Sequence, residues 1–263
     1  MKKLVIISLT LAVIAPQTVC GWGKVGHRTV VALTERYLTA KAQSNIAHYF
    51  PEGLQKEASW ADAHRHDEAY DFTTHYHTMM MTDDFVYAPA LREPKGGDCV
   101  TGLNVIDYNL SHREALHMTD SMVVFNTRML IHIVGDMHCP AHSYLKDAPN
   151  NKWKCTYKGK EYRNYHTIVD HIPDGLFEGQ SASEAAGNLD KWDKCRIREV
   201  QSGSLTDWAG DCCRRDRILY EVNPVGTYDL APDTEERLAP ACIEAITAAG
   251  YRLAFLLNKY FDY

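Results

Sequence analysis

Hydrophobic positions along most of this chain recur with the period of an α-helix. Residues 28–38, 100–110 and 121–138 each carry one apolar face at helical spacing. The clearest stripe lies near the C-terminus, and its members are Ala239, Ile243, Ile246, Gly250, Leu253 and Leu257. Such a stripe predicts a helix that packs one face on the core. Thr39 and Ser59 each precede an apolar stretch and are expected to cap two further helices.

Strand-like character is confined to residues 152–162, which predict a hairpin that turns near Lys158 and Gly159. No internal repeat, low-complexity tract or Gly/Ser linker divides the chain. The prediction is therefore an all-α fold: a single, mostly helical domain with a small β-hairpin and long functional loops.

The first 21 residues have the features of a secretory signal peptide. Two lysines precede an apolar run, residues 4–16, that is too short to span a membrane. Val19 and Gly21 suit a cleavage site after Gly21, so the mature catalytic domain, residues 22–263, is expected to begin at Trp22. A buried or anchoring helix and lipidation at Cys20 are the alternatives. The prediction is a secreted or periplasmic protein without stable membrane insertion.

The charge of the chain limits the kind of partner it can bind. The formal charge is −6, and loss of the two signal lysines makes the mature chain −8. A negative chain is a poor match for binding nucleic acid through a broad basic surface. A phosphodiester substrate stays compatible, because bound metal ions would place positive charge inside a pocket where a phosphate needs it.

Seven cysteines remain after the predicted cleavage, and none has the paired spacing of a zinc finger. In an oxidising compartment some of them are expected to form disulfides, in a pattern that the sequence leaves open. They are Cys99, Cys139, Cys155, Cys195, Cys212, Cys213 and Cys242.

The strongest chemical pattern lies in residues 130–142. His132 and Asp136 are four residues apart and share one face of the predicted helix, where they can bind a metal ion together. An apolar helix would not bury both groups without a partner. Pro140 is expected to end the helix, so that His142 can reach a second metal ion from the following turn.

Other segments add candidate ligands. His166 and Asp170 repeat the four-residue spacing, and Asp62 lies at the start of a predicted helix. His75 and His77 would share one face of an extended segment, so one is expected to be a ligand and the other a neighbour. Nitrogen and oxygen ligands without thiolates suit zinc.

The predicted mature N-terminus provides one more candidate site. A free α-amine and the carbonyl oxygen of the same residue can chelate a metal ion as a pair. Cleavage after Gly21 would create such a pair on Trp22, and His27 lies five residues further on.

The order of these segments resembles the zinc-dependent family of single-strand nucleases and 3′-nucleotidases, of the mung bean nuclease type. Zinc-dependent bacterial phospholipase C is a distant relative of that family. The resemblance spans nearly the whole mature chain. It rests on Trp22…His27, Trp60-Ala61-Asp62, His75-Tyr76, His132-x-x-Gly135-Asp136-x-His138-x-Pro140-x-His142 and Asn164-x-His166-x-x-x-Asp170.

The resemblance implies three zinc ions held by nine residues. The first site would consist of Asp62, His75, His132 and Asp136. The second would consist of His142, His166 and Asp170, with an open position. The third would consist of the amine and carbonyl of Trp22, together with His27 and a bridging Asp136.

The resemblance also implies an activity and the residues that perform it. The expected reaction is hydrolysis of single-stranded RNA, DNA and 3′-nucleotides to 5′-phosphates, by a hydroxide shared between two zinc ions. Asp62 would orient the hydroxide and Arg65 would bind the phosphate charge in the transition state. Tyr76 would stack a base, and His138 would orient a ligand carboxylate. The protein is expected to be a monomer.

Three departures from the family pattern stand out. Cys139 replaces a glutamine and Val169 a tryptophan. Thr78 stands where the family tends to place a carboxylate near the base. The methionine run 79–81 follows it and is expected to pack in the core or a loop.

Two other functions stay open. One is a zinc-dependent phospholipase C, which needs an apolar lip and a choline-type pocket. The other is a non-catalytic zinc-binding protein with closed sites.

Overall fold

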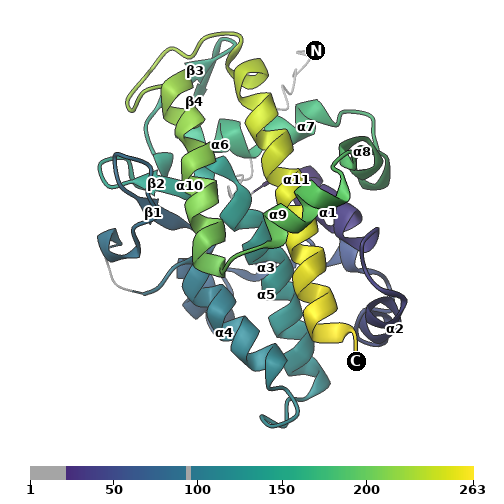
Figure 1. The fold of residues 1–263 in the computed structure, drawn as a ribbon. Helices are drawn as coiled ribbons and strands as arrows, with labels where there is room; N and C mark the ends of the chain where they lie inside the picture. The colour runs from purple at the N-terminus through teal and green to yellow at the C-terminus, as the bar shows by residue number, and fades with distance from the viewer. Residues whose placement is uncertain (1–21, 93–95) are drawn as a thin grey trace, which may run out of the picture.

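The structure is a computed structural model that describes residues 22–92 and 96–263. The signal-peptide prediction concerns residues 1–21 and lies outside the described residues. The chain forms a mostly helical single domain, as the periodicity predicts (Figure 1). Its helices are α1 Lys24–Glu35, α2 Ala40–Tyr49, α3 Trp60–His64, α4 Cys99–Ser111, α5 Asp120–His138, α6 Tyr165–Asp170, α7 Ile172–Leu176, α8 Ala182–Leu189, α9 Lys194–Gln201, α10 Leu205–Val222 and α11 Thr234–Phe261.

The longest helix, α11, is the centre of the packing. It runs along most of the molecule with α10 beside it and α5 behind it, and it also contacts α1 (Figure 1). A Cβ on Gly250 would lie 2.7 Å from a side-chain carbon of Leu33, so glycine is what lets α1 approach α11 this closely. The predicted apolar stripe is buried from Ile246 onward, whereas Ile243 is 38% exposed.

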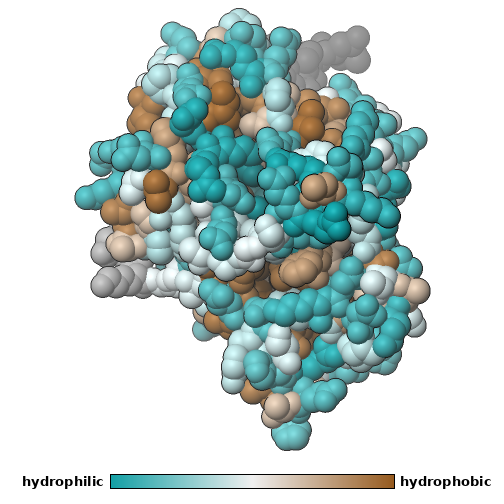
Figure 2. All heavy atoms as spheres, viewed as in Figure 1, coloured by the Kyte–Doolittle hydropathy of each residue, from teal (hydrophilic) through white to brown (hydrophobic). Residues whose placement is uncertain are grey.

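By length and composition α11 could cross a membrane. However, 72% of its most apolar window is buried inside the fold, which is typical of a core helix. On the face shown in Figure 2, hydrophilic side chains predominate and hydrophobic ones form small separate patches.

The helix starts follow the expected capping chemistry in part. The side chain of Thr39 accepts a hydrogen bond from the backbone N–H of Ala42 and so caps α2, as predicted. Ser59 precedes α3 but makes no such bond, so its predicted capping role is wrong.

The predicted hairpin is present as β3 Cys155–Tyr157 paired antiparallel with β4 Lys160–Tyr162. Lys158 and Gly159 both have positive φ, at 49° and 76°, which is the conformation that a two-residue hairpin turn requires.

A second pair of strands was not predicted. β1 Met79–Met81 pairs in parallel with β2 Ser143–Leu145, with Met79 opposite Ser143. All three methionines are buried, which confirms the expected packing role of the run. Neither three-residue strand alternates in polarity, so no local pattern indicates the pairing. The pairing matters because β1 begins just after His77 and β2 begins just after His142.

The predicted disulfides are absent from the described part of the chain. All seven cysteines there are free thiols, and only Cys195 is exposed. The other six are buried, and a buried thiol packs as a small apolar side chain.

Candidate metal centre

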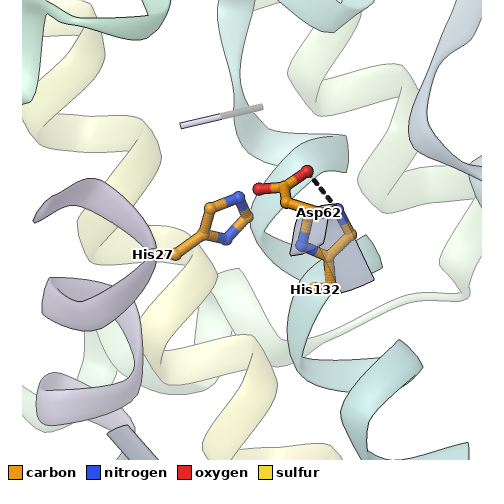
Figure 3. Close-up of side chains that lie close together, drawn as sticks. All are labelled: His27, Asp62 and His132. Atoms are coloured by element: carbon orange, nitrogen blue, oxygen red, sulfur yellow. Dashed lines mark ion pairs between the residues drawn. The ribbon is translucent and has the colours of Figure 1, made fainter. Parts of the chain in front are cut away.

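A buried cluster of histidine and aspartate side chains lies around the C-terminal half of α5. His132 and Asp136 come from α5, His27 from α1 and Asp62 from α3. Figure 3 shows His27, Asp62 and His132 turned toward one another from these three helices, with Asp62 Oδ1 3.5 Å from His132 Nε2. Grouped in this way, the three side chains could hold a metal ion.

Asp136 is the centre of this cluster and is completely buried. Its Oδ2 lies 3.0 Å from His132 Nε2 and 2.8 Å from His77 Nδ1. Its other oxygen, Oδ1, lies 3.2 Å from His27 Nε2. The two carboxylate oxygens therefore face different histidines, which is the arrangement that a carboxylate bridging two metal ions needs.

The approach of His27 depends on a glycine in α5. The rings of His27 and His132 stack with centroids 4.6 Å apart. A Cβ on Gly135 would lie 2.6 Å from His27 Nδ1, closer than any side chain tolerates. The glycine between His132 and Asp136 in the sequence therefore makes room for the imidazole of α1.

The structure brings His77 into the cluster, and it does not bring the predicted His75 there. His77 is buried, and its Nδ1 lies 2.9 Å from His132 Nε2. The ring of His75 instead lies against Gly96, and the side chain is partly exposed. The physical reason is that Glu68–His77 is a 3₁₀ segment with three residues per turn, so residues two apart point in different directions.

Two other predicted residues lie at the edge of the site. Tyr76 is partly buried and packs against α4, where a Cβ on Gly102 would collide with its ring. Arg65 follows α3, one helical turn after Asp62, and is partly exposed. Its Nε donates to His66 Nε2 at 3.3 Å.

A second cluster joins the turn after α5 to α6. His166 Nε2 lies 2.9 Å from Asp170 Oδ2, and the rings of His142 and His166 are 4.9 Å apart. His142 Nδ1 donates to the carbonyl of His77 at 2.6 Å, which leaves its Nε2 available as a ligand. The same Nδ1 lies 3.7 Å from Asp136 Oδ2, so the two clusters adjoin.

Buried polar atoms without hydrogen-bond partners gather at these two clusters. Of twelve such side-chain atoms in the described chain, nine belong to this set: Trp22, His27, Asp62, His77, His132, Asp136, His142, His166 and Asp170. A buried polar atom without a partner is costly, and a zinc ion binds the lone pairs of imidazole and carboxylate groups. Eight of the nine atoms belong to such groups, whereas the atom of Trp22 is an indole N–H, which only donates hydrogen bonds. The donor set therefore fits bound metal ions.

The start of α1 is held against the second cluster. The indole of Trp22 is completely buried. The backbone N–H of Gly23 donates to the carbonyl of Asp170 at 3.1 Å, so the peptide bond between Trp22 and Gly23 lies beside a predicted ligand. His27, one turn further along α1, reaches Asp136.

His138 does not contact a ligand carboxylate, contrary to the expectation. Its Nδ1 donates to the carbonyl of Val134, and its Nε2 accepts from Arg252 at 3.0 Å. Burial and the neighbouring Arg252 hold the pKa of His138 well below its usual value, so the ring is neutral. His138 thus ties the end of α5 to α11.

The metal-free cluster has an uneven distribution of protons. Burial lowers the pKa of His132, but Asp136 and Asp62 beside it raise that pKa to about 9 overall. Burial lowers the pKa of His142 to about 4. At neutral pH the metal-free protein therefore holds a proton on His132 and none on His142.

We expect zinc binding near neutral pH to release a proton from His132, because a ligand nitrogen must be deprotonated. Zinc affinity should rise with pH up to about 9. In the metal-free protein the raised pKa of His132 makes the stability of the fold decrease, not increase, as the pH rises. The contribution of protonated His132 to the free energy of unfolding is complete below about pH 6.5 and is lost as the pH rises through about 9.

Calorimetric titration in buffers of different ionisation enthalpy measures the proton release. Denaturant unfolding of the metal-free protein across the same pH range measures the loss of stability. Zinc binding without proton release, together with a flat stability profile, would contradict the assigned protonation of His132.

Comparison with known proteins finds one matching family model and several related nucleases. The family model of the S1/P1 nucleases matches residues 22–262. Nuclease S1 of Aspergillus oryzae is 25% identical over 98% of both chains. Nuclease P1 of Penicillium citrinum is 27% identical over 90% of this chain and 97% of its own, and Endonuclease 4 of Arabidopsis thaliana is 27% identical over 92% and 89%.

Proposed function

This chain belongs to the S1/P1 nuclease family, and from that membership we propose that it is a zinc-dependent endonuclease and 3′-nucleotidase. Its substrates would be single-stranded RNA and DNA and 3′-nucleotides, cleaved to leave 5′-phosphates. Family membership supports a hydrolase that acts on nucleic acid. The observation that carries the finer proposal is the gathering of eight histidine and aspartate side chains around Asp136 and Asp170, each with a buried atom that has no hydrogen-bond partner.

We assign the ligands of three zinc ions with one change from the resemblance. His77 replaces His75 in the first site, because His77 is the one that contacts Asp136. The sets are Asp62, His77, His132 and Asp136 for the first ion; His142, His166 and Asp170 for the second; and the amine and carbonyl of Trp22 with His27 and Asp136 for the third. When bound, zinc supplies Lewis acidity and lowers the pKa of water toward neutrality.

The residues at the rim of the site would act on the substrate. The side chain of Asp62 is 18% exposed, and its Oδ1 has no hydrogen-bond partner, so it can orient an attacking water. Arg65 would pair with the charge that develops on the phosphate. Tyr76 would stack a base on the part of its ring that α4 leaves uncovered.

The remaining proposals concern the mature protein. Its chain would begin at Trp22, which is also where the match to the family begins. It would be secreted or periplasmic, and monomeric. A zinc-dependent phospholipase C is the second candidate function, and a non-catalytic zinc-binding protein is the third.

The direct test is release of acid-soluble nucleotides from single-stranded RNA and DNA by zinc-loaded protein that begins at Trp22. We expect release that a chelator stops and added zinc restores, with much slower release from double-stranded DNA. Hydrolysis of phosphatidylcholine without nucleotide release would favour the phospholipase. Folded protein that binds zinc and hydrolyses neither substrate would favour the non-catalytic alternative.

Substitution of the two neighbouring histidines tests the ligand assignment. His77→Ala should lose zinc from the first site and lower nuclease activity by roughly 100-fold, equivalent to about 3 kcal/mol. His75→Ala is the matched control and should keep its zinc and nearly all its activity, because its ring lies against Gly96. Zinc content and initial rates measure both effects. The reverse pattern would restore His75 as the ligand.

A further inference from the structure

Cys139 lies among the side chains of the second cluster. It follows the last residue of α5 and is completely buried. Its Sγ lies 3.3 Å from Asp170 Oδ1, to which the thiol donates. The sulfur of Cys139, a nitrogen of His142 and an oxygen of Asp170 all lie within 4.8 Å of one another, a grouping that could hold a metal ion.

The histidine and the carboxylate beside Cys139 each keep one buried atom without a hydrogen bond. These atoms are His142 Nε2 and Asp170 Oδ2, in side chains that are 2% and 1% exposed, and Asp170 Oδ2 faces His166 Nε2 at 2.9 Å. The other nitrogen of His142 is already used by the carbonyl of His77. His142 Nε2, His166 Nε2 and the carboxylate of Asp170 therefore surround the place where a cation would lie, and the sulfur of Cys139 lies beside it.

We propose that Cys139 is a ligand of the metal ion in the second site, together with His142, His166 and Asp170. This inference rests on the proposed binding of zinc at that site. Cysteine sulfur, histidine nitrogen and aspartate oxygen are the atoms that zinc binds in tetrahedral sites. On binding, the S–H bond of Cys139 breaks, its proton passes to solvent, and the sulfur binds the metal as a thiolate.

A fourth ligand from the protein changes the role of the second site. Sites with four protein ligands are closed and structural, whereas catalytic zinc sites keep one position open. The second ion would then hold the turn after α5 to α6, and water activation would fall to the ions around Asp136. The sulfur also makes the site selective for thiophilic metals such as zinc, cobalt and cadmium over magnesium or calcium.

Cobalt substitution provides the test, because a cobalt–thiolate bond has a charge-transfer band in the near ultraviolet. A Cys195→Ser background removes the exposed thiol. In that background we expect the band at full cobalt loading, and we expect it to disappear with Cys139→Ser. Cys155→Ser removes a buried thiol in the hairpin and should leave the band unchanged.

Each alternative outcome has a defined meaning. A metal-loaded parent protein without the band, or a Cys139→Ser protein that keeps it, overturns the assignment. Cys139→Gln, which introduces the residue usual in the family, is a second variant in case the serine protein does not fold, and it should also lose the band. Nuclease activity with three bound metals and no band would defeat this inference alone. Absence of any metal binding would defeat the proposed function as well.

Discussion

Asp136→Asn should lower nuclease activity by at least about 1000-fold, equivalent to about 4 kcal/mol. The two oxygens of Asp136 face different histidines, His27 at 3.2 Å and both His77 and His132 within 3.0 Å. An amide carries no charge and offers a single oxygen. The variant should therefore lose zinc from the first and third sites together, while the second site stays occupied.

Zinc analysis and initial rates on single-stranded substrate measure this prediction. Asp120→Asn is a matched control on the same helix, since Asp120 is also paired with a histidine, His48, but both side chains are exposed. It should leave zinc content and activity unchanged. Circular dichroism verifies that both variants fold. An Asp136→Asn protein that still holds three zinc ions would refute the bridging role of this carboxylate.

Addition of one residue before Trp22 should lower activity by roughly 100-fold, about 3 kcal/mol, and remove one zinc ion. An added residue converts the α-amine into an amide, whose nitrogen no longer binds a metal. The buried indole of Trp22 and the hydrogen bond from Gly23 to Asp170 hold the start of the mature chain beside the second cluster.

The control for this prediction is an extension at the other end of the chain. Tyr263 is 52% exposed, so one extra residue after it should change neither zinc content nor rate. Mass spectrometry establishes the N-terminus of each preparation. Full activity with a residue before Trp22 would show that the amine takes no part in the site.

The local geometry of helices explains why much of this centre can be predicted from the chain. In a helix, residues four apart lie on the same face whatever surrounds them. His132 with Asp136 and His166 with Asp170 therefore become pairs as soon as their helices form, and the structure shows both pairs in contact. The hairpin turn at Lys158 and Gly159 follows from the same kind of local rule.

Local rules could not decide whether His75 or His77 is the ligand. An extended segment would present both histidines on one face, and the sequence offers no strong signal against that conformation. The segment is a 3₁₀ helix, and the strand that follows it pairs with Ser143–Leu145, directly after His142. That pairing brings the carbonyl of His77 to within 2.6 Å of His142 Nδ1 and so selects His77.

By itself the sequence determined that the domain is mostly helical, where some of its helices start, where its hairpin turns, and which His/Asp pairs share a helix face. All of these features depend on residues close together in the chain. The tertiary structure alone decided which distant groups meet. His27 reaches Asp136 because Gly135 has no side chain, and Cys139 meets Asp170 because α6 packs against the turn that follows α5. Such contacts depend on how the helices pack together, and the spacing of residues along the chain carries no record of that packing.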